Sequence, residues 1–283
     1  TNTVIATISV GTNPDGIAVT SDGTTVYVAN RDDSTISVID TATNTITDTL
    51  TACSSIGQLE MGPSDVYLYG VCSSGIIKID VSSGSIVSTT TSYYGSSQLM
   101  IDTEYSTTRG FALHSILTEF SLSSLSSVDA SSTLTGSGVS RMAYDSSRDQ
   151  IYVTQSADSY VVVLDAATLT EQDIWTGWVD VYGVPTWAGD VVYDASRDYL
   201  YLSDLSQTVF KIDPSSGSVV DQVELTGSSS GNSNYTMVMN AAADTLWVAG
   251  YQSDMVSRVD LSTFTRTTSI SVGEEPDWMV IAE

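Results

Sequence analysis

Short runs in which apolar residues alternate with threonine or serine recur along the whole chain. Residues 25–30 (TVYVAN) and 35–40 (TISVID) are two such runs, separated by a short polar stretch. Alternation with a period of two residues is the pattern of a β-strand that is buried on one face. No segment of useful length has the period of an amphipathic helix. The pattern therefore predicts an all-β protein built from short strands.

Four predicted strands joined by polar links make up residues 14–52. The strands cover residues 16–20, 25–30, 35–40 and 45–50. The links carry Asp-Gly, Asp-Asp and Thr-Asn pairs, whose residues favour tight turns. Four short antiparallel strands form one sheet with two apolar faces, so this sheet must stack on similar sheets to bury both faces.

The same module occurs six times. The large residue of the second strand recurs about every 40 to 50 residues, and a repeat of this length with four strands predicts a β-propeller. These large residues are Tyr27, Tyr67, Phe111, Tyr152, Tyr201 and Trp247. We place the modules at 14–52, 53–92, 93–135, 136–178, 179–227 and 228–272 of a single domain, with terminal strands in 1–13 and 273–283.

The two ends of the chain resemble extra strands of the repeat. Residues 4–10 match a fourth strand and residues 278–282 match a first strand, so a partial blade would lack its two middle strands. Two alternatives remain open at this point. The propeller has six blades with surplus ends, or a seventh blade is completed by residues or a partner outside this chain. The second alternative would leave unpaired strand edges suited to head-to-tail assembly.

Most modules close their third strand with an aspartate. A carboxylate at this position could bind a metal, but it also precedes a turn in every case. We expect these side chains to accept hydrogen bonds from backbone amides two residues further on. The aspartates are Asp40, Asp80, Asp165, Asp213 and Asp260.

The first module resembles the YVTN-type β-propeller repeat of archaeal and bacterial surface-layer proteins. The matching residues are 14–19 (PDGIAV), 21–23 (SDG), 26–30 (VYVAN), 37–40 (SVID) and 43–46 (TNTI). The resemblance covers essentially the whole chain and is strongest in this module. It implies a propeller, usually of seven blades, outside the cell. It implies no chemistry, because the same architecture serves surface proteins, lactonases, lyases and electron-transfer enzymes.

The charge of the chain limits its partners. Asp and Glu number 34 against 9 Lys and Arg, which gives a formal net charge of -25. Binding to duplex nucleic acid or to an anionic membrane requires basic residues and is not expected. The acidic surface reflects either adaptation to salt or cation binding. The Ser/Thr-rich composition is typical of secreted proteins, and the chain opens TNTV without a signal peptide, as a mature or trimmed product would.

Two cysteines are predicted to form a disulfide. Cys53 lies in the link into the second module, and Cys72 ends the second strand of that module. In a propeller both positions lie at the same face of the same blade, and an extracellular protein would oxidise them.

Aromatic residues gather in links that a propeller would place on one face. The link 175–187 is unusually long and holds three of the five tryptophans. Asp180, Glu274, Glu275 and Asp277 accompany the aromatics, and such a surface suits sugar stacking or a protein interface. Alternatively, the first and last of these tryptophans fill the gap between blades of unequal size, which we favour for Trp187. The candidates are Trp175, Trp178, Tyr182, Trp187, Tyr93, Tyr94 and Trp278.

Few residues suggest catalysis or metal binding. Glu60 and Asp102 lie in first strands and could hold a cation such as Ca²⁺, a hard ion that prefers oxygen ligands. His114 is the single histidine and has no recognisable catalytic partner. There is no haem-attachment run and no glycine-rich phosphate loop. Asn234 begins a glycosylation sequon.

The sequence thus predicts a non-enzymatic extracellular or cell-surface propeller that acts in assembly or binds proteins or glycans. No cofactor is expected other than Ca²⁺ at Glu60 or Asp102. The alternative is a lactonase- or lyase-like enzyme with a divalent cation in the central channel. A sensor module of a larger protein is a further alternative.

Overall fold

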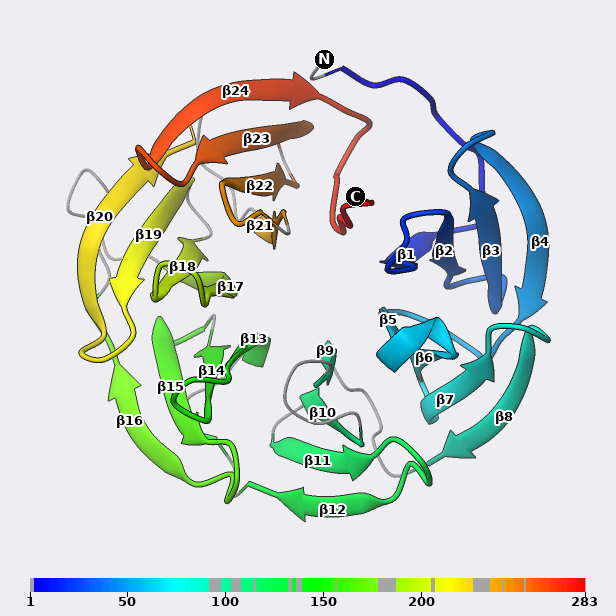
Figure 1. Cartoon of the computed structure of the whole chain (residues 1–283), viewed down its shortest axis with the longest axis horizontal. Coiled ribbons are helices and arrows are strands. Elements are labelled where there is room, and N and C mark those ends of the chain that lie inside the picture. Colours follow the sequence, from blue (N-terminus) through cyan, green and yellow to red (C-terminus); the bar gives the residue numbers. More distant parts are fainter. Residues whose placement is uncertain are drawn as a thin grey trace. The chain divides into compact units, whose positions relative to one another are not determined.

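The computed structural model describes residues 3–91, 98–102, 108–113, 116–131, 134–135, 139–155, 157–177, 187–204, 207–225, 235–240, 242–251 and 253–282. Within these residues the chain forms strands β1 to β24 and one short 3-10 helix. The strands make six antiparallel sheets of four strands each, which we call blades (Figure 1). The prediction of an all-β chain with six complete repeats is confirmed. No helix in the described part is long and apolar enough to span a membrane.

The described residues divide into two compact units. The N-terminal unit comprises residues 5–130 with 280–282, and the C-terminal unit comprises residues 131–279 with 3 and 4. Each unit contains three blades.

The N-terminal unit holds blades 1 to 3. Blade 1 consists of β1 (Pro14–Val19), β2 (Thr25–Asn30), β3 (Thr35–Asp40) and β4 (Thr45–Thr51). Blade 2 consists of β5 (Leu59–Met61), the 3-10 helix η1 (Pro63–Asp65), β6 (Tyr67–Cys72), β7 (Gly75–Asp80) and β8 (Ser85–Thr90). Blade 3 consists of β9 (Gln98–Ile101), β10 (Arg109–Leu113), β11 (Leu117–Ser121) and β12 (Ser127–Ala130).

The C-terminal unit holds blades 4 to 6. Blade 4 consists of β13 (Val139–Asp145), β14 (Gln150–Gln155), β15 (Tyr160–Asp165) and β16 (Glu171–Trp175). Blade 5 consists of β17 (Ala188–Asp194), β18 (Tyr199–Asp204), β19 (Thr208–Asp213) and β20 (Ser218–Glu224). Blade 6 consists of β21 (Tyr235–Met239), β22 (Thr245–Gly250), β23 (Met255–Asp260) and β24 (Thr265–Ser271).

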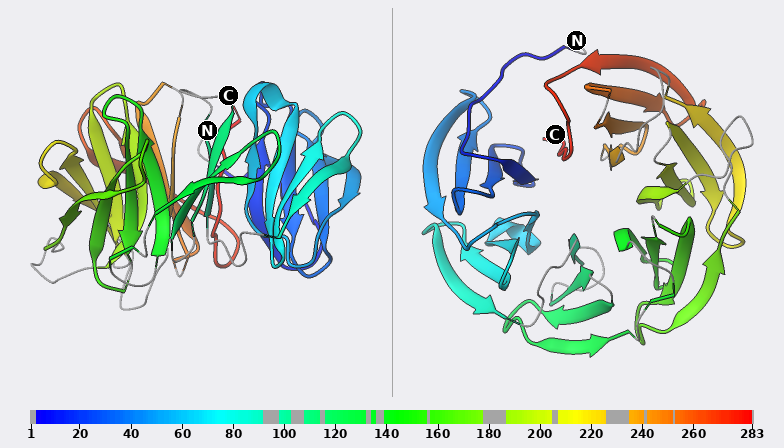
Figure 2. Two further views of the ribbon diagram at one scale, coloured as in Figure 1. Left: turned by 90° about the horizontal axis from the view of Figure 1, so that it is seen from below. Right: turned by 180° about the vertical axis from the view of Figure 1, so that it is seen from behind.

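Strands within every blade pair in chain order. The first strand of each blade contacts the first strand of the next blade in the same unit, so we call it the inner strand and the fourth the outer strand. Figure 2 shows the strands running between two opposite faces of each unit. The chain enters the inner strands at one of these faces, where the links between second and third strands also lie, and we call it the entry face.

The predicted strands at the two chain ends are not formed. Residues 4–10 and 276–282 have no β-structure, and the side chains of Val4 and Ile5 are 54% and 84% exposed. A lone strand leaves half of its backbone groups without partners, so an extended segment that pairs with no neighbour does not form a sheet. The expectation of a partial seventh blade is therefore corrected to six complete blades.

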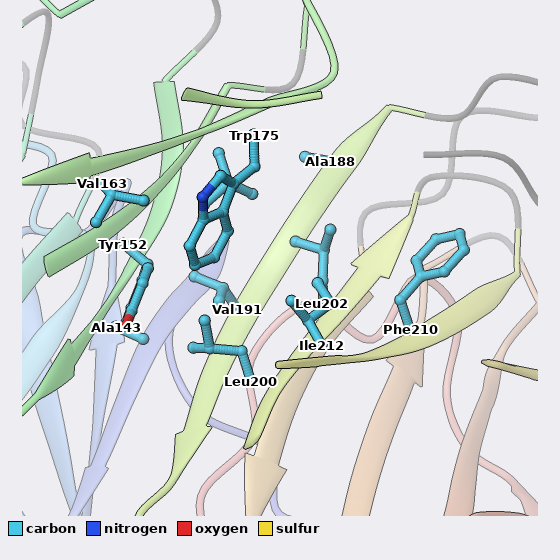
Figure 3. Packing of buried hydrophobic residues seen from close by; sticks show 11 residues of the cluster. Ala143, Tyr152, Val163, Trp175, Ala188, Val191, Leu200, Leu202, Phe210 and Ile212 are labelled. Atoms are coloured by element: carbon cyan, nitrogen blue, oxygen red, sulfur yellow. The ribbon is translucent and has the colours of Figure 1, made fainter. Parts of the chain in front are cut away.

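In blades 1, 2, 4 and 5, an aromatic residue of the second strand packs against the next blade of the same unit. Tyr152 lies opposite Val163 of its own blade and belongs to a buried cluster with Val191 and Leu202 of blade 5. Figure 3 shows these side chains interleaved between the two sheets, with the Trp175 ring beside Tyr152. The centroids of the two rings are 5.3 Å apart. Burial on both faces is what the repeat requires of a sheet that no helix covers.

In blade 2 the residue at this position is Tyr69, not the predicted Tyr67. Tyr69 is 1% exposed and pairs with Lys78, in the same register that pairs Tyr27 with Val38. Tyr67 points to the same side of the sheet, because it lies two residues earlier, and the ammonium group of Lys78 lies 3.8 Å from its ring centroid. The apolar pattern alone cannot distinguish two aromatics on one face of a strand.

The aspartates that close the third strands form the predicted turns. The carboxylate of Asp40 accepts hydrogen bonds from the hydroxyl of Thr43 at 2.8 Å and from its amide at 2.7 Å. These bonds favour the charged form and lower the pKa of Asp40. The other four carboxylates also accept backbone amides of their turns, from donors three residues on for Asp80 and Asp165 and, as predicted, two residues on for Asp213 and Asp260. The turn interpretation is confirmed for these five carboxylates.

The repeated sequence Asp-x-Ser-Arg-Asp joins neighbouring blades of the C-terminal unit. Arg148 follows β13 and donates hydrogen bonds to Asp145 of its own turn at 2.8 Å. Its two terminal nitrogens also contact both carboxylate oxygens of Asp198 in blade 5, each at 2.6 Å. Arg197 repeats the arrangement by donating to Asp194 and to the backbone carbonyl of Ala243 in blade 6. The Arg148 bond lowers the pKa of Asp198.

The last residue of the second strand anchors the link that precedes its blade. In blade 1, the side-chain oxygen of Asn30 accepts the amide of Gly11 at 2.9 Å. In blade 2, Cys72 takes the same position and forms the predicted disulfide with Cys53, with the two Cα atoms 5.9 Å apart. A covalent bond and a hydrogen bond thus serve the same purpose in adjacent blades.

We expect Arg148→Ala to lower the free energy of unfolding by about 2 to 3 kcal/mol, because charge-assisted hydrogen bonds between blades are lost and the buried Asp145 loses its cation. Arg31→Ala is the matched control. Arg31 makes one exposed contact of 3.5 Å to Asp15 and should cost less than about 1 kcal/mol. Urea unfolding of both variants measures the difference, and equal losses would contradict the assigned role.

Replacing both Cys53 and Cys72 by serine should lower the free energy of unfolding by about 3 kcal/mol, since the disulfide restricts the unfolded chain. The cysteines are 19 residues apart in sequence. Unfolding of the oxidised protein, the reduced protein and the double variant tests this. The last two should agree, and an unchanged midpoint in all three would refute the prediction.

Candidate functional site

Three inner strands of the C-terminal unit bring charged residues together at the entry face. β13 contacts β17, and β17 contacts β21. Arg141 and Asp190 lie near the starts of β13 and β17, and Thr236 lies at the start of β21. The segment that follows β24 adds Asp277 and Trp278 to this group. We call these five residues the inner-strand cluster.

Arg141 stacks on Trp278. The guanidinium carbon lies 4.4 Å from the centroid of the indole ring, within the range of a cation–π interaction. The Arg141 amide donates to the hydroxyl of Thr154 at 3.0 Å, and this hydroxyl donates to the carbonyl of Gly189 in blade 5 at 2.7 Å. The backbone beneath Arg141 is thus held by two blades, and the side chains of Arg141 and Trp278 both remain partly exposed.

Asp190 links the inner strands of blades 5 and 6. Its side chain is 6% exposed and accepts the amides of Met237 at 2.7 Å and Val191 at 2.8 Å. Burial raises the pKa of Asp190, while the positive charge of Arg141 and the two amides oppose this change. The carboxyl group therefore has a structural role and also contributes to the electrostatic environment of Arg141.

Hydrogen bonds to blade 6 fix the segment that carries Trp278. The hydroxyl of Thr236 donates to the carbonyl of Asp277. The hydroxyl of Tyr251 donates to the carboxylate of Glu275 at 2.9 Å, and the Glu275 amide donates to Asp254 at 2.9 Å. These contacts hold the backbone that directly precedes Trp278, and the stacking on Arg141 orients the indole ring.

Glu60 occupies a position that is apolar in the other blades. It pairs with Tyr69, just as Ala18 pairs with Tyr27 and Ala143 with Tyr152. Burial raises the pKa of Glu60 to about 8. A carboxyl group that is mostly neutral at pH 7 is a poor ligand for Ca²⁺, which binds ionised oxygen donors.

Asp102 is engaged elsewhere. Its carboxylate, 3% exposed, forms an ion pair with the Nε atom of Arg109 at 2.9 Å. Within the described ranges, no three or more His, Cys, Asp or Glu side chains are grouped so as to hold a metal ion. The predicted role of Glu60 and Asp102 as cation ligands thus remains a prediction.

The structure separates the predicted aromatic candidates. Trp175 is 8% exposed and packs on Gly217 of blade 5, where an added Cβ atom would lie 2.5 Å from the indole. Trp187 is 47% exposed, so the expectation that it fills a gap between blades is corrected: its ring is not enclosed by the sheets. Trp278 belongs to the inner-strand cluster. Tyr93, Tyr94, Trp178, Tyr182, His114, Asp180 and Asn234 lie outside the described residues.

Sequence reasoning missed Arg141 and Asp190. Both stand in inner strands, whose other residues are mainly apolar or small. An alignment of the six inner strands by register would have identified Arg141 and Asp190 as candidate site residues. Charged side chains at these positions need partners from neighbouring blades.

The raised pKa of Glu60 predicts a pH-dependent stability. The folded pKa of about 8 exceeds the ordinary glutamate pKa of 4.5, so between these pH values the folded protein binds a proton that the unfolded chain has lost. Stability should therefore fall between these pH values, by up to about 1.4 kcal/mol per pH unit. Glu60→Gln should remove this slope, whereas the exposed Glu274→Gln should retain it. Urea unfolding from pH 5 to 9 measures the slope, and identical slopes for both variants would contradict the assignment.

Comparisons with known proteins identify the fold. No family model matches the chain, and no curated protein matches it. Among solved structures, it is similar to Kuenenia stuttgartiensis hydrazine synthase, with 13% identity, a TM-score of 0.78, and 96% of this chain and 91% of that chain covered. The chain is also similar to a functionally unknown protein from Desulfotomaculum acetoxidans, with 14% identity and a TM-score of 0.77. That match covers 96% of this chain and 91% of the other chain. The β-propeller domain of Myceliophteria thermophila Cps50 (Swd1) is similar with 11% identity and a TM-score of 0.72, and the match covers 96% of this chain and 90% of that chain. Together with the six four-stranded sheets, these similarities show that the chain has the fold of a six-bladed β-propeller.

Proposed function

We propose that this chain is a non-enzymatic propeller that binds a protein partner through the entry face of its C-terminal unit. The observation that carries the proposal is the stacked pair of Arg141 and Trp278. Tryptophan and arginine are the residue types that contribute most to protein interfaces, because each combines a large apolar surface with polar groups. Here both are held by contacts to neighbouring strands, so little side-chain freedom is lost on binding.

The second candidate is a glycan partner, which the exposed tryptophans favour. One face of the Trp278 ring is used by Arg141, and Trp187, which directly precedes β17, is 47% exposed. Indole rings stack on the apolar faces of sugars, and nearby carboxylates accept hydrogen bonds from sugar hydroxyls. The same surface thus accommodates either class of partner, and the experiment below distinguishes them.

An extracellular or cell-surface location is part of the proposal. The disulfide between Cys53 and Cys72 suits an oxidising compartment, and Cys72 is 2% exposed. The first-module resemblance to surface-layer repeats supports the same location. A formal net charge of -25 favours a partner with a neutral or basic surface.

The enzyme alternative has weaker support. It requires a divalent cation at Glu60 or Asp102. Burial raises the pKa of Glu60 to about 8, and Asp102 is paired with Arg109 at 2.9 Å. Both arrangements work against cation binding at these carboxylates, so we favour binding over catalysis.

Trp278→Ala should weaken partner binding at least tenfold, which corresponds to about 1.4 kcal/mol. The purified protein and the variant would be tested on a glycan array and against surface extracts by cross-linking with mass spectrometry. Val220→Ala is the control, because Val220 is exposed on the outer strand β20. A glycan signal lost in Trp278→Ala would select the second candidate. Binding that survives both Trp278→Ala and Arg141→Gln would refute the assignment of this site.

A further inference from the structure

The outer strand of every blade forms the edge of its four-stranded sheet. Such an edge pairs with strands of other molecules unless it is protected. In all six blades the register between the third and fourth strands shifts by one residue near the start of the outer strand. A β-bulge of this kind twists the edge and is one known form of protection.

Four outer strands carry a second protection, an aspartate directly after the bulge. Its carboxylate accepts the backbone N–H of the next residue. The donors are Thr49 to Asp48 at 2.7 Å, Ala130 to Asp129 at 2.8 Å, Ile174 to Asp173 at 2.8 Å, and Gln222 to Asp221 at 2.9 Å. We call these four residues the edge aspartates.

The N–H groups covered in this way point outward. In blade 1, the amide of Ala52 donates to the carbonyl of Ser34, so these two residues form a hydrogen-bonded pair. From this pair onward, hydrogen-bonded and non-hydrogen-bonded pairs alternate between β3 and β4. Thr49 lies opposite Ser37 in a pair that is not hydrogen-bonded, and its N–H therefore faces away from β3. The bond from the Leu225 amide to the Gln207 carbonyl places Gln222 in the same way in blade 5. Each edge aspartate thus blocks a donor that an added strand would use.

Blade 2 lacks this protection. Ser88 stands at the position of the edge aspartates, because it lies opposite Lys78 as Asp48 lies opposite Val38. β8 (SIVSTT) contains no charged residue, whereas β24 of blade 6, which also lacks the aspartate, carries Arg266. The side chains of Ile86 and Val87 on β8 are 39% and 53% exposed.

We propose that β8 is a docking edge at which two copies of this chain pair antiparallel through their β8 strands. The argument for a second copy is electrostatic. Self-pairing of β4, β12, β16 or β20 would bring edge aspartates close together, and self-pairing of β24 would bring Arg266 side chains together. Self-pairing of β8 opposes no charges within the strand pair. It also buries Ile86 and Val87 of both copies, and two-fold pairing closes the assembly at a dimer.

The net charge of -25 per chain opposes this dimer at low salt. Screening shortens the reach of that repulsion, from about 10 Å at 0.1 M salt to about 3 Å at 1 M. Because one strand pair is a small interface, we expect a dissociation constant on the order of 0.1 mM. The dimer should therefore appear at high protein concentration and should become stronger as salt is added.

Light scattering after size-exclusion chromatography and sedimentation velocity, from 0.1 to 1 M NaCl, test the proposal on the whole chain. Ser88→Asp restores the edge aspartate, and Val87→Lys places a charge on the edge; each should weaken the dimer at least tenfold. Val128→Lys is the matched control, since Val128 stands at the equivalent position of β12 and is 61% exposed. Thermal unfolding verifies that each variant is folded.

Three outcomes would overturn the proposal. These are a monomer at 1 mM protein in all salt concentrations, a dimer that Ser88→Asp leaves intact, and a dimer that Val128→Lys weakens as much as Val87→Lys. The partner site at Arg141 and Trp278 belongs to the other unit, so failure of either proposal leaves the other untouched. Asp129→Ser provides the reverse test, because removal of an edge aspartate from β12 should create a second docking edge and larger oligomers.

Discussion

Every blade has two apolar faces, and no helix among the described residues covers either one. The sheet is stable only when both faces are packed, so each blade depends on its neighbours. The second-strand aromatic carries most of this packing: Tyr69, Tyr152 and Tyr201 are all at most 1% exposed. The outer strands extend the contact. Leu50 of blade 1 and Trp175 of blade 4 cover Gly84 and Gly217 in the turns of the following blades, where a Cβ atom would collide with them. A large side chain on one blade and a glycine on the next therefore form a single interblade contact.

With few basic residues available, the chain uses carboxylates as hydrogen-bond acceptors for its own backbone. The five third-strand aspartates hold turns, the edge aspartates cover outward N–H groups, and Asp145 and Asp194 hold the first turns of blades 4 and 5. Asp190 extends this use across two blades. Much of the negative charge is thus part of the architecture, and its amount alone is not evidence for a cation ligand. The rare arginines are correspondingly placed where one side chain serves two partners, as Arg148 does with Asp145 and Asp198.

The fold could be predicted from the sequence because period-two alternation and turn residues are local signals that repeat six times. The predictions that failed concerned features that depend on residues in neighbouring strands or blades. Tyr67 and Tyr69 lie on one face of a strand, and only pairing with Lys78 shows which of them is equivalent to Tyr27. The end segments have the composition of strands, but a strand also needs a partner to pair with. Trp187 directly precedes β17 and was expected to be enclosed, yet it is 47% exposed. Arg141 and Trp278 are more than a hundred residues apart, and no local pattern connects them.

A repeat protein makes its exceptions interpretable, because each position has five structural equivalents. Glu60 is unusual because its counterparts include Ala18 and Ala143, and Cys72 because its counterpart Asn30 does the same work with a hydrogen bond. Ser88 would attract no notice in an ordinary strand and becomes informative only beside the edge aspartates. Packing fixes the interblade aromatic in blades 1, 2, 4 and 5, whereas it places no such demand on an inner-strand charge or an outer-strand edge. Positions that are free to differ without loss of the fold are the ones where binding can be introduced, and Arg141 and Ser88 are both of this kind.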